Sequence, residues 1–429
     1  MKIALLGYGI EGESTYLYLK TLYPDAQFVI YDQAAQAKKQ LPSGVVFKGG
    51  VSSFHNIDAD MVVRTPAIRP DSITTRGEVT SATKLFFAAC PAPIIGVTGS
   101  KGKGTTASLI ASILRASGRK VHLVGNIGEP ALAALDDITI DDVVVYELSS
   151  FQLWDMKASP QVAVVLMIEA DHLDVHRDMD EYLAAKAQIT AYQQANDTVV
   201  YNEENVYARA IGVASTADHK IPYPQPQFAH VEEEYFYYDK TKLCPVSALK
   251  LPGGHNQQNA LAAIAAAWPW VKDGAVIAAG LSAFTGLPHR LKLVREVAQV
   301  RYYDDSNGTT PGSAIAALRA FSQPKVVILG GSAKGADFGE LANEVKKASI
   351  RQVLLIGQEA ARIGAALDAA GVTQYRILHD VTMSDIVHQA HEVAQPNDVV
   401  ILSPACASFG MFKNYQDRGE QFIGAVNKL

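Results

Sequence analysis

The sequence predicts an α/β protein of three domains, in which short buried strands alternate with helices. Its 429 residues are too many for one hydrophobic core, and this length favours two to four domains. Strand-like apolar runs alternate with helical segments in successive stretches of the chain, as a parallel sheet requires. Two proline-marked joints, Pro91–Pro93 and Gly286–Pro288, separate these stretches. We therefore expect domains at residues 1–91, 92–287 and 288–429.

Composition is typical of a globular enzyme and excludes several other classes of protein. Hydrophobic residues make up 48% of the chain and charged residues 19%. The net charge of −6 and the lack of basic runs argue against a nucleic-acid partner, and no apolar run is long enough to span a membrane. The three cysteines show no CxxC spacing, and the MKIALLGYG start lacks a secretory signal. We expect a cytoplasmic monomer with small-molecule substrates and no nucleic-acid or membrane partner.

The first predicted domain starts with a strand that runs into a glycine-rich turn. Strand IALLG leads into GYGIEG, a helix (STYLYLKTLY) and a second strand (QFVIYD) that ends at Asp32. This spacing resembles a dinucleotide-binding fingerprint, in which the turn and the acidic residue hold a nucleotide. We expect Gly9, Ile10 and Asp32 to contact a nucleotide diphosphate, although a turn that merely packs helix on strand gives the same pattern. Glu11 lies where a phosphate would approach, so its charge is unhelpful unless it points away.

The most informative segment is IIGVTGSKGKGTT, at residues 94–106. A short apolar strand ends in a glycine-rich loop, and an amphipathic helix (ASLIASILRASG) follows. Such loops cradle nucleotide phosphates with backbone N–H groups, a lysine supplies a point charge, and a hydroxyl can bind Mg²⁺. A glycine-rich turn before an ordinary helix is the alternative. The predicted phosphate-binding residues are Gly99, Ser100, Lys101, Gly102, Lys103, Gly104, Thr105 and Thr106, with Thr105 as the metal-binding hydroxyl.

Acidic and histidine side chains follow two other buried strands of the predicted central domain. Glu147 ends the strand in VVVYELSSFQL, and His172 follows the strand in VAVVLMIEADHLD. Carboxyl ends of parallel strands meet at one edge of a sheet, so both side chains are placed to bind a metal or substrate beside the phosphate loop. A helix-capping glutamate and a hydrogen-bonded loop histidine are the structural alternatives.

Lys186 is unexpected because it lies on the apolar face of its predicted helix, DEYLAAKAQITAYQQ. At helical spacing it shares that face with Tyr182, Leu183, Ile189 and Thr190. The side chain could extend its amine to solvent, or burial could lower the pKa of the amine and make it nucleophilic. A neutral amine can take up CO₂ to form a carbamate, which is an anionic metal ligand.

The remaining sequence contains an insert and a further alternating domain. Residues 220–252 are rich in Tyr and Pro and predict an antiparallel or irregular insert. Strands VVILGGS, QVLLIG and DVVILSPACAS alternate with helices in the last segment, which predicts a third α/β domain.

Ordered motifs along essentially the whole chain resemble the Mur ligase superfamily of ATP-dependent amide-forming enzymes. Besides the phosphate loop and the lysine helix they are GNIG (125–128), ELSSFQL, ADHLD, GGHNQQN (253–259), LPHR (287–290), DDS (304–306), GGSAKGADF and LSPACASFGMFKNYQDRG. The last segment is most similar to the branch that adds D-glutamate to UDP-N-acetylmuramoyl-L-alanine in peptidoglycan precursor synthesis. The resemblance implies a Rossmann-like UDP-binding domain, a central P-loop ATPase-like domain and a C-terminal Rossmann-like domain.

The resemblance also implies ATP, two Mg²⁺ ions and roles for particular residues. Catalytic roles would fall to Lys103, Glu147, His172, Lys186 and His289, with Lys186 carbamylated. One Mg²⁺ would be held by Thr105 and Glu147, and the second by His172 and Lys186. The UDP-sugar would contact Asn126, Ser149 and Gln152. Adenine and ribose would lie against Asn259, Arg290 and Asp305, and the incoming amino acid against Lys334, Ser408, Phe409 and Tyr415.

Several residues depart from the family pattern. Asn307 stands where the family has a lysine after the Asp-Ser pair, which removes a cation expected near the glutamate carboxylates. The first domain reads RTPAIRP where the subfamily has a serine-proline-glycine turn, which puts the diphosphate contact in doubt. The GKGT of the phosphate loop is closer to folylpolyglutamate synthase, the alternative within the ligases. An NAD-dependent oxidoreductase built on GYGIEG and a catalytically inactive relative are the remaining alternatives.

Overall fold

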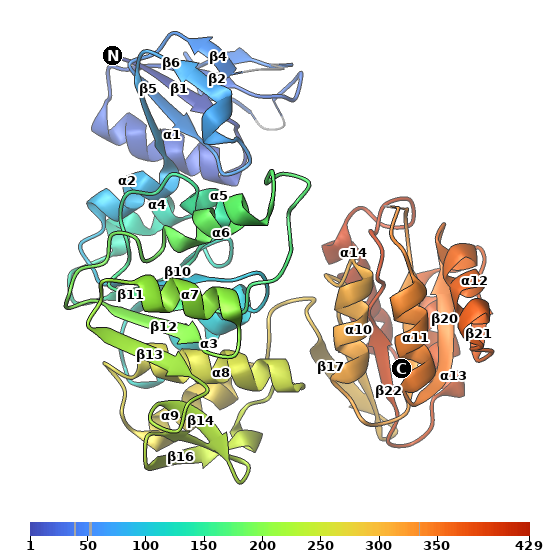
Figure 1. The fold of residues 1–429 in the computed structure, drawn as a ribbon. Coiled ribbons are helices and arrows are strands. Elements are labelled where there is room, and N and C mark those ends of the chain that lie inside the picture. The colour runs from blue at the N-terminus through green and yellow to red at the C-terminus, as the bar shows by residue number, and fades with distance from the viewer. Residues whose placement is uncertain (38–39, 51–53, 334) are drawn as a thin grey trace. The chain divides into compact units, whose positions relative to one another are not determined.

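Parallel β-sheets flanked by helices make up this protein, so the predicted α/β class is confirmed (Figure 1). The computed structural model describes residues 1–37, 40–50, 54–333 and 335–429. The chain divides into two compact units, of which the first contains Met1–Ala248 and Gln257–Phe284 and the second Leu249–Asn256 and Thr285–Leu429. The limits of three domains given above remain a prediction.

The first sheet of the first unit is parallel, with the strand order β3-β2-β1-β5-β7. In β1, Ile3 and Leu5 pack into one core and Ala4 into another, because successive side chains of a strand point to opposite faces. The elements of this part are β1 (Lys2–Leu6), α1 (Ile10–Leu22), β2 (Gln27–Tyr31), β3 (Val46–Lys48), β5 (Met61–Arg64), η1 (Pro70–Ser72), β7 (Glu78–Ser81), α2 (Ala82–Ala89), and a separate pair, β4 (Phe54–Ile57) with β6 (Ile73–Thr75).

The central sheet of the first unit is also parallel, with the order β13-β12-β11-β8-β10-β9. Its strands are β8 (Ile94–Thr98), β9 (Val121–Gly125), β10 (Val143–Glu147), β11 (Val162–Val165), β12 (Thr198–Asn202) and β13 (His219–Tyr223). Strands β8, β10, β11 and β12 are buried along their whole length, which is why they read as continuous apolar runs rather than alternating ones. Connecting elements are α3 (Lys103–Ala116), α4 (Ala131–Ala134), η2 (Leu135–Asp137), α5 (Ser150–Leu153), α6 (Met179–Ala187) and α7 (Val206–Ala214).

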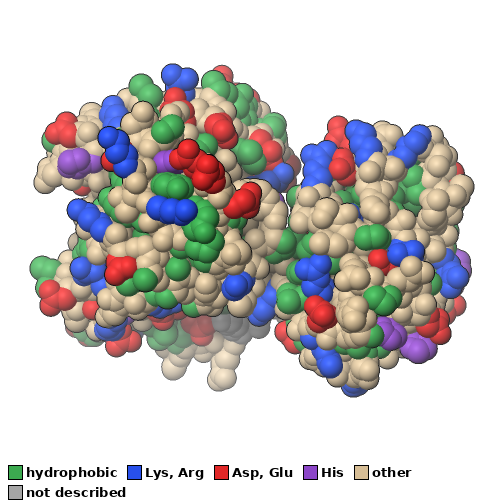
Figure 2. Space-filling model, turned by 90° about the horizontal axis from the view of Figure 1, so that it is seen from below, with side chains coloured by type: hydrophobic (Ala, Val, Ile, Leu, Met, Phe, Trp, Pro, Cys, Tyr) green, Lys and Arg blue, Asp and Glu red, His purple; other side chains and the backbone are tan. Residues whose placement is uncertain are grey.

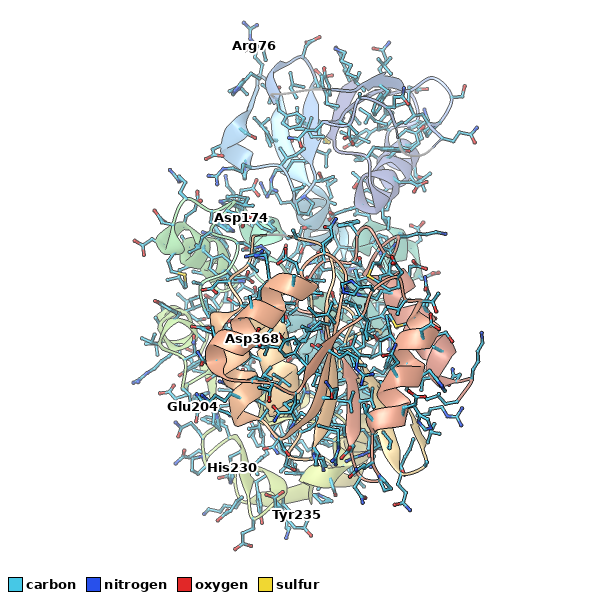
Figure 3. The ribbon with its side chains drawn as sticks, turned by 90° about the vertical axis from the view of Figure 1, so that its right-hand side faces the viewer. Arg76, Asp174, Glu204, His230, Tyr235 and Asp368 are labelled. Atoms are coloured by element: carbon cyan, nitrogen blue, oxygen red, sulfur yellow. The ribbon has the colours of Figure 1, made fainter. Side chains whose placement is uncertain are left out.

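The insert predicted within residues 220–252 is an antiparallel sheet, as expected, and His230 and Tyr235 mark it in Figure 3. Its strands are β14 (Ala229–Glu232), β15 (Tyr235–Tyr238) and β16 (Thr241–Pro245), followed by η3 (Val246–Ala248), α8 (Gly254–Ala267) and α9 (Gly274–Ala283). Helix α9 packs closely on α3. A Cβ on Gly280 would lie 2.5 Å from Ile113 Cα, and the Ser112 hydroxyl donates to Gly280 O at 2.7 Å.

The sheet of the second unit has the order β17-β18-β22-β19-β20-β21, with β17 antiparallel to β18 and the other pairs parallel. Val326 of β19 packs in a core with α13 and α14, and its neighbour Val327 packs in a core with α10, α11 and α12, so helices cover both faces. The strands are β17 (Lys292–Val297), β18 (Val300–Asp304), β19 (Lys325–Gly330), β20 (Ile350–Ile356), β21 (Tyr375–Ile377) and β22 (Val399–Leu402). The helices are α10 (Pro311–Arg319), α11 (Gly339–Lys347), α12 (Ala360–Ala370), α13 (Met383–Val393) and α14 (Tyr415–Val426).

Helix α6 is shorter than the sequence predicts, because it ends at Ala187 and continues only as turns. The N–H groups of Ile189 and Thr190 donate to carbonyls three residues earlier, which is tighter than α-helical geometry and suits β-branched residues at a helix end.

In the described part of the chain, no helix is both long and apolar enough to cross a bilayer. Acidic and basic side chains are interspersed over the face of each unit that Figure 2 shows.

We predict that Gly280→Ala destabilises the first unit, because the added Cβ would collide with the α3 backbone. Overpacking of this kind costs about 1–3 kcal/mol, and urea unfolding followed by circular dichroism would measure it. Ala279→Ser, at an exposed position of the same helix, is the matched control and should stay within about 0.5 kcal/mol of the parent protein. Equal unfolding midpoints for the two variants would contradict the packing described here.

Candidate functional site

Three neighbouring strands of the central sheet bring the predicted phosphate and metal-binding segments to one edge. Strand β8 lies between β10 and β11, and all three run parallel. The phosphate loop follows β8, Glu147 ends β10, and His172 lies a few residues beyond β11. Carboxyl ends of adjacent parallel strands form the usual ligand-binding edge of an α/β sheet. The order of the strands therefore brings these segments together although they are far apart in the sequence.

The phosphate loop depends on a left-handed glycine and on its own lysine. Gly102 has a φ of +86°, and a Cβ there would lie 2.3 Å from Asn259 Oδ1, so the position excludes a side chain. Lys103 Nζ donates to the backbone oxygens of Gly99 and Ser100, each at 3.0 Å. Helix α3 begins at Lys103, so the N–H groups of its first turn adjoin the loop, an arrangement that suits phosphate.

The other loop residues divide between the interior and the solvent. Thr105 and Thr106 are buried, and Thr106 Oγ1 donates to Asn259 Oδ1 at 3.3 Å. Lys101 is exposed and pairs with Glu169. Lys103, rather than Lys101, therefore supplies the charge inside the loop.

Lys186 lies inside the protein beside the phosphate loop, with 1% of its surface exposed. Its Nζ donates to Gly99 O at 2.7 Å and lies 4.6 Å from the centre of the Tyr182 ring. Burial, and then the charge of Lys103, hold the pKa of this amine well below its usual value, while nearby carboxylates oppose the shift. The amine does not reach solvent, and in its neutral form it is a nucleophile.

Glu147 and His172 differ in their surroundings. Glu147 is buried, and its charge is one of those that act on Lys186. His172 has a left-handed φ of +54° and an exposed side chain, and the centre of its ring lies 5.0 Å from that of Phe151, edge to face. Within the described ranges, no group of three or more His, Cys, Asp or Glu side chains is arranged to hold a metal ion.

The three residues expected to contact the UDP-sugar form one hydrogen-bonded cluster. Gln152 Oε1 accepts from Asn126 Nδ2 at 3.2 Å and from the N and Oγ of Ser149 at 2.9 and 3.0 Å. Ser149 caps α5, and its Oγ in turn accepts from Gln152 N. The ELSSFQL motif thus makes a rigid turn whose polar groups lie close to GNIG.

Glu11 turns away from the glycine loop and towards this cluster. Burial raises the pKa of Glu11 to about 7, while the charge of Arg64 and a hydrogen bond from Gln152 oppose the shift. The negative charge that seemed unhelpful for a diphosphate is therefore directed at the central part of the unit.

The glycine-rich turn after β1 is shaped by Asp32. Its carboxylate accepts from Tyr8 N at 3.0 Å and from Ala34 N at 2.9 Å. Gly9 is the exposed N-cap of α1, and Ile10 is 67% exposed. Asp32 thus fixes the turn, and Gly9 and Ile10 are accessible at the start of the helix.

In the second unit, His289 and Asp305 are buried around the end of β18. His289 Nδ1 lies 2.7 Å from Asp304 Oδ2, so Asp304 orients the ring. The Asp305 carboxylate accepts from Leu291 N at 3.1 Å and from Ser403 Oγ at 2.6 Å, and burial raises its pKa to about 7. Arg290 is exposed.

The predicted amino-acid site is only partly described. Ser408 is buried, Phe409 is 63% exposed, and the Tyr415 ring lies 6.1 Å from that of His289, edge to face. Lys334 lies outside the described residues. Of the residues predicted to bind adenine and ribose, Asn259 belongs to the first unit, and Arg290 and Asp305 belong to the second.

Arg418 has a structural role that the sequence reasoning missed. It is buried and donates to Ser306 Oγ at 2.9 Å, to Ser306 O at 2.8 Å and to Cys406 O at 3.2 Å. It thereby ties the DDS turn to the SPACAS turn. Arg418 entered the sequence analysis only as part of a family motif, NYQDRG. The signal that could have singled it out is a charged residue on the buried side of α14.

We predict that Glu11→Gln stabilises the protein increasingly as the pH rises. The pKa of Glu11 in the folded protein, about 7, exceeds its value in the unfolded chain. The parent protein therefore loses stability as the pH rises from the unfolded pKa to the folded pKa. The Gln variant stays neutral and does not show this fall. The difference in unfolding free energy should grow by about 2 kcal/mol between pH 5 and pH 8, measured by thermal unfolding at several pH values. A difference that stays constant with pH would contradict the burial of an ionisable Glu11.

Two family models match the chain, the Mur ligase middle domain at residues 97–267 and the Mur ligase, glutamate ligase domain at residues 289–406. The chain is 34% identical to the UDP-N-acetylmuramoylalanine--D-glutamate ligase of Ruminiclostridium cellulolyticum, over 100% of this chain and 97% of the relative. It is 37% identical to the protein of the same name from Acetivibrio thermocellus, over 100% of this chain and 96% of that one.

Solved structures share the fold at lower identity. The UDP-N-acetylmuramate-alanine ligase MurC of Thermotoga maritima has a TM-score of 0.61 at 17% identity, over 100% of this chain and 99% of that chain. The folylpolyglutamate synthase of Mycobacterium tuberculosis, complexed with ADP, has a TM-score of 0.57 at 16% identity, over 81% and 92%. The fold is thus common to both ligase types, and it is the identity along the full length that decides the family. This chain belongs to the Mur ligase family of ATP-dependent amide ligases.

Proposed function

We propose that this protein joins D-glutamate to UDP-N-acetylmuramoyl-L-alanine, using ATP, in peptidoglycan precursor synthesis. Relatives at 34% and 37% identity carry the name of this ligase, and the chain covers them almost end to end. The structural observation that carries the proposal is the buried Lys186 amine against the phosphate loop. This pairing suits transfer of a phosphoryl group to a carboxylate, which is how an amide ligase activates its substrate.

ATP and Mg²⁺ would bind at the carboxyl edge of the central sheet. The N–H groups at the start of α3 and the Lys103 amine suit the β- and γ-phosphates. Thr105 and Glu147 would hold one Mg²⁺, and His172 with carbamylated Lys186 the second. Mg²⁺ usually binds through one or two carboxylates together with phosphate oxygens, and the buried Glu147 suits that donor set. When bound, Mg²⁺ offsets the charge of the phosphate oxygens.

The reaction proceeds in two steps that the protein supports by binding and orientation. A carboxylate oxygen of the UDP-sugar attacks the γ-phosphorus, ADP leaves, and an acyl-phosphate forms. The amine of D-glutamate then attacks the carbonyl carbon, a proton is lost from nitrogen, and phosphate leaves. Lys103 offsets charge on the transferring group, while Asn126, Ser149 and Gln152 orient the acceptor.

The low pKa of the buried Lys186 amine supports its carbamylation. The neutral Nζ attacks CO₂, a C–N bond forms, and the proton released leaves a carbamate with one negative charge. Burial and the adjacent Lys103 favour the neutral amine that this step needs. The carbamate would then supply oxygen donors to the second Mg²⁺.

The second unit would bind adenosine and the amino acid. Arg290 and Asp305, with Asn259 of the first unit, would contact adenine and ribose, and His289, oriented by Asp304, would act beside the acyl-phosphate. The amino acid would lie against Ser408, Phe409, Tyr415 and Lys334. Asn307 replaces the family lysine here, so another cation would balance the second glutamate carboxylate.

We further propose that the chain acts in the cytoplasm as a monomer, with domains at residues 1–91, 92–287 and 288–429. Cys90, Cys244 and Cys406 carry free thiols, which suits a reducing compartment. Gly9, Ile10 and Asp32 would meet the uridine diphosphate at the start of α1, because a helix N-terminus favours anions.

We predict that the purified protein releases phosphate from ATP when it is given Mg²⁺, UDP-N-acetylmuramoyl-L-alanine and D-glutamate together. Omission of any one component, or replacement of D-glutamate by L-glutamate or lysine, should reduce the rate to background. Turnover with a different amino acid would keep the ligase but change its specificity. Turnover only with a folate acceptor would establish folylpolyglutamate synthase instead, and an inert protein would contradict the proposal.

The same assay tests Lys186→Ala, with Lys157→Ala as the matched control. Lys157 is an exposed lysine, so its removal should not disturb the site. Lys186→Ala should lower kcat by about 100-fold or more, since it removes a charge-bearing group from the reacting centre. Lys157→Ala should leave turnover unchanged. Similar kinetics for the two variants would exclude a role for Lys186.

A further inference from the structure

The RTPAIRP turn, which departs from the family pattern, carries two arginines that reach out of the first sheet. Arg64 is the last residue of β5, and Arg69 precedes η1. Both side chains contact the segments that follow β10 and β11 of the central sheet. The departure thus adds contacts inside the first unit, and the chemistry of these contacts differs between the two arginines.

Arg64 is fixed to α5. Its side chain is fully buried, its two terminal nitrogens each donate to Phe151 O at 3.2 Å, and it pairs with Asp155. Lys84 Nζ also lies 2.7 Å from Asp155 Oδ2. Burial would raise the pKa of Asp155, yet the bonds from Arg64 and Lys84 hold it below its usual value. A buried guanidinium is tolerated only with such partners, so this contact strongly favours one position of α5.

Arg69 is fixed to α6 and to the loop before it. It donates to Glu181 Oε1 at 2.8 Å and Oε2 at 3.2 Å, and to Val175 O at 2.7 Å. Its guanidinium lies 4.6 Å from the centre of the Trp154 ring. The hydrogen bond from Arg69 is the largest cause that lowers the pKa of Glu181 to about 2. One side chain therefore joins the end of α5, the histidine loop and the lysine helix.

The segments held in this way carry groups assigned to the reaction. Helix α5 contains Gln152 and is capped by Ser149, and α6 contains Lys186. His176 packs between them, with its ring stacked 5.3 Å from that of Phe151 and its Nε2 3.0 Å from Ser150 Oγ. A shift of either helix would move its groups relative to the phosphate loop.

We propose that Arg64 and Arg69 are positioning residues of the ligase reaction, Arg64 for the segment that orients the UDP-sugar and Arg69 for the helix that carries Lys186. This inference rests on the proposed function. Both guanidinium groups contact protein acceptors on the segments that they would position. A residue that acts through α5 alone alters binding of the UDP-sugar, and a residue that acts through α6 alone alters turnover and the demand for Mg²⁺.

The test compares Arg64→Met, Arg69→Met and Arg76→Met in steady-state kinetics. Arg76, labelled in Figure 3, is exposed at the far end of the same sheet and serves as the matched control. We expect Arg64→Met to raise the KM for UDP-N-acetylmuramoyl-L-alanine about tenfold with kcat within about twofold. We expect Arg69→Met to lower kcat about tenfold and to raise the half-saturating Mg²⁺ concentration, with a smaller change in that KM than in Arg64→Met, because Arg69 contacts only the end of α5, at the Trp154 ring. Arg64→Lys and Arg69→Lys should each recover part of the loss.

Hydrogen exchange on the free protein gives a second readout that needs no substrate. Amides of α5 should exchange faster in Arg64→Met, and those of α6 in Arg69→Met, with neither changed in Arg76→Met. Asp155→Asn replaces Arg64→Met if that variant does not fold. Exchange rates in α5 and α6 that match those of the parent protein would overturn the positioning role. A fall in kcat that only matches the loss of folded protein, with the same KM for the UDP-sugar in Arg64→Met and Arg69→Met, would overturn it as well. Absence of turnover in the parent protein would instead count against the proposed function, which keeps the two failures distinct.

Discussion

The hydrogen bond from Lys186 Nζ to Gly99 O is the interaction on which the rest of the site depends. It joins a lysine that is 1% exposed to the first residue of the phosphate loop at 2.7 Å. Burial, and then the nearby charge of Lys103, lower the pKa of this amine, so the neutral form is favoured. Lys103 also donates to Gly99 O, so both lysines hold this residue of the loop. Lys103 and Lys186 thus share one backbone acceptor, Gly99 O, in the loop that is predicted to bind phosphate.

The sheet explains why this contact can form at all. The phosphate loop, Glu147 and the histidine segment come from three strands that are adjacent in space but separated by intervening helices. Their parallel direction puts all three carboxyl ends at one edge. Two arginines of the first part of the chain then contact the segments that follow these strands, Arg64 at Phe151 O and Arg69 at Glu181. We propose that these contacts position the groups assigned to the reaction.

Local patterns in the sequence predicted the elements, and long-range contacts could not be predicted from it. The alternating strands and helices, the glycine-rich loop and the Lys186 face each have a short-range signal, and the α/β class and the family were confirmed. Arg64 contacts Phe151 across 87 positions, and Arg69 contacts Glu181 across 112. No periodicity links residues so far apart, so their pairing became visible only in the folded chain. The early end of α6 was missed for the opposite reason, since its helical pattern continues past the point where the backbone tightens.

The most direct test of this account is ¹³C NMR of the protein equilibrated with ¹³C-labelled bicarbonate, with Lys186→Ala recorded alongside. The account predicts a carbamate resonance in the parent protein that is absent from the variant, because uptake of CO₂ needs a neutral amine and burial favours that form at Lys186. A parent spectrum without that resonance, or an identical resonance in both proteins, would contradict the role given to Lys186.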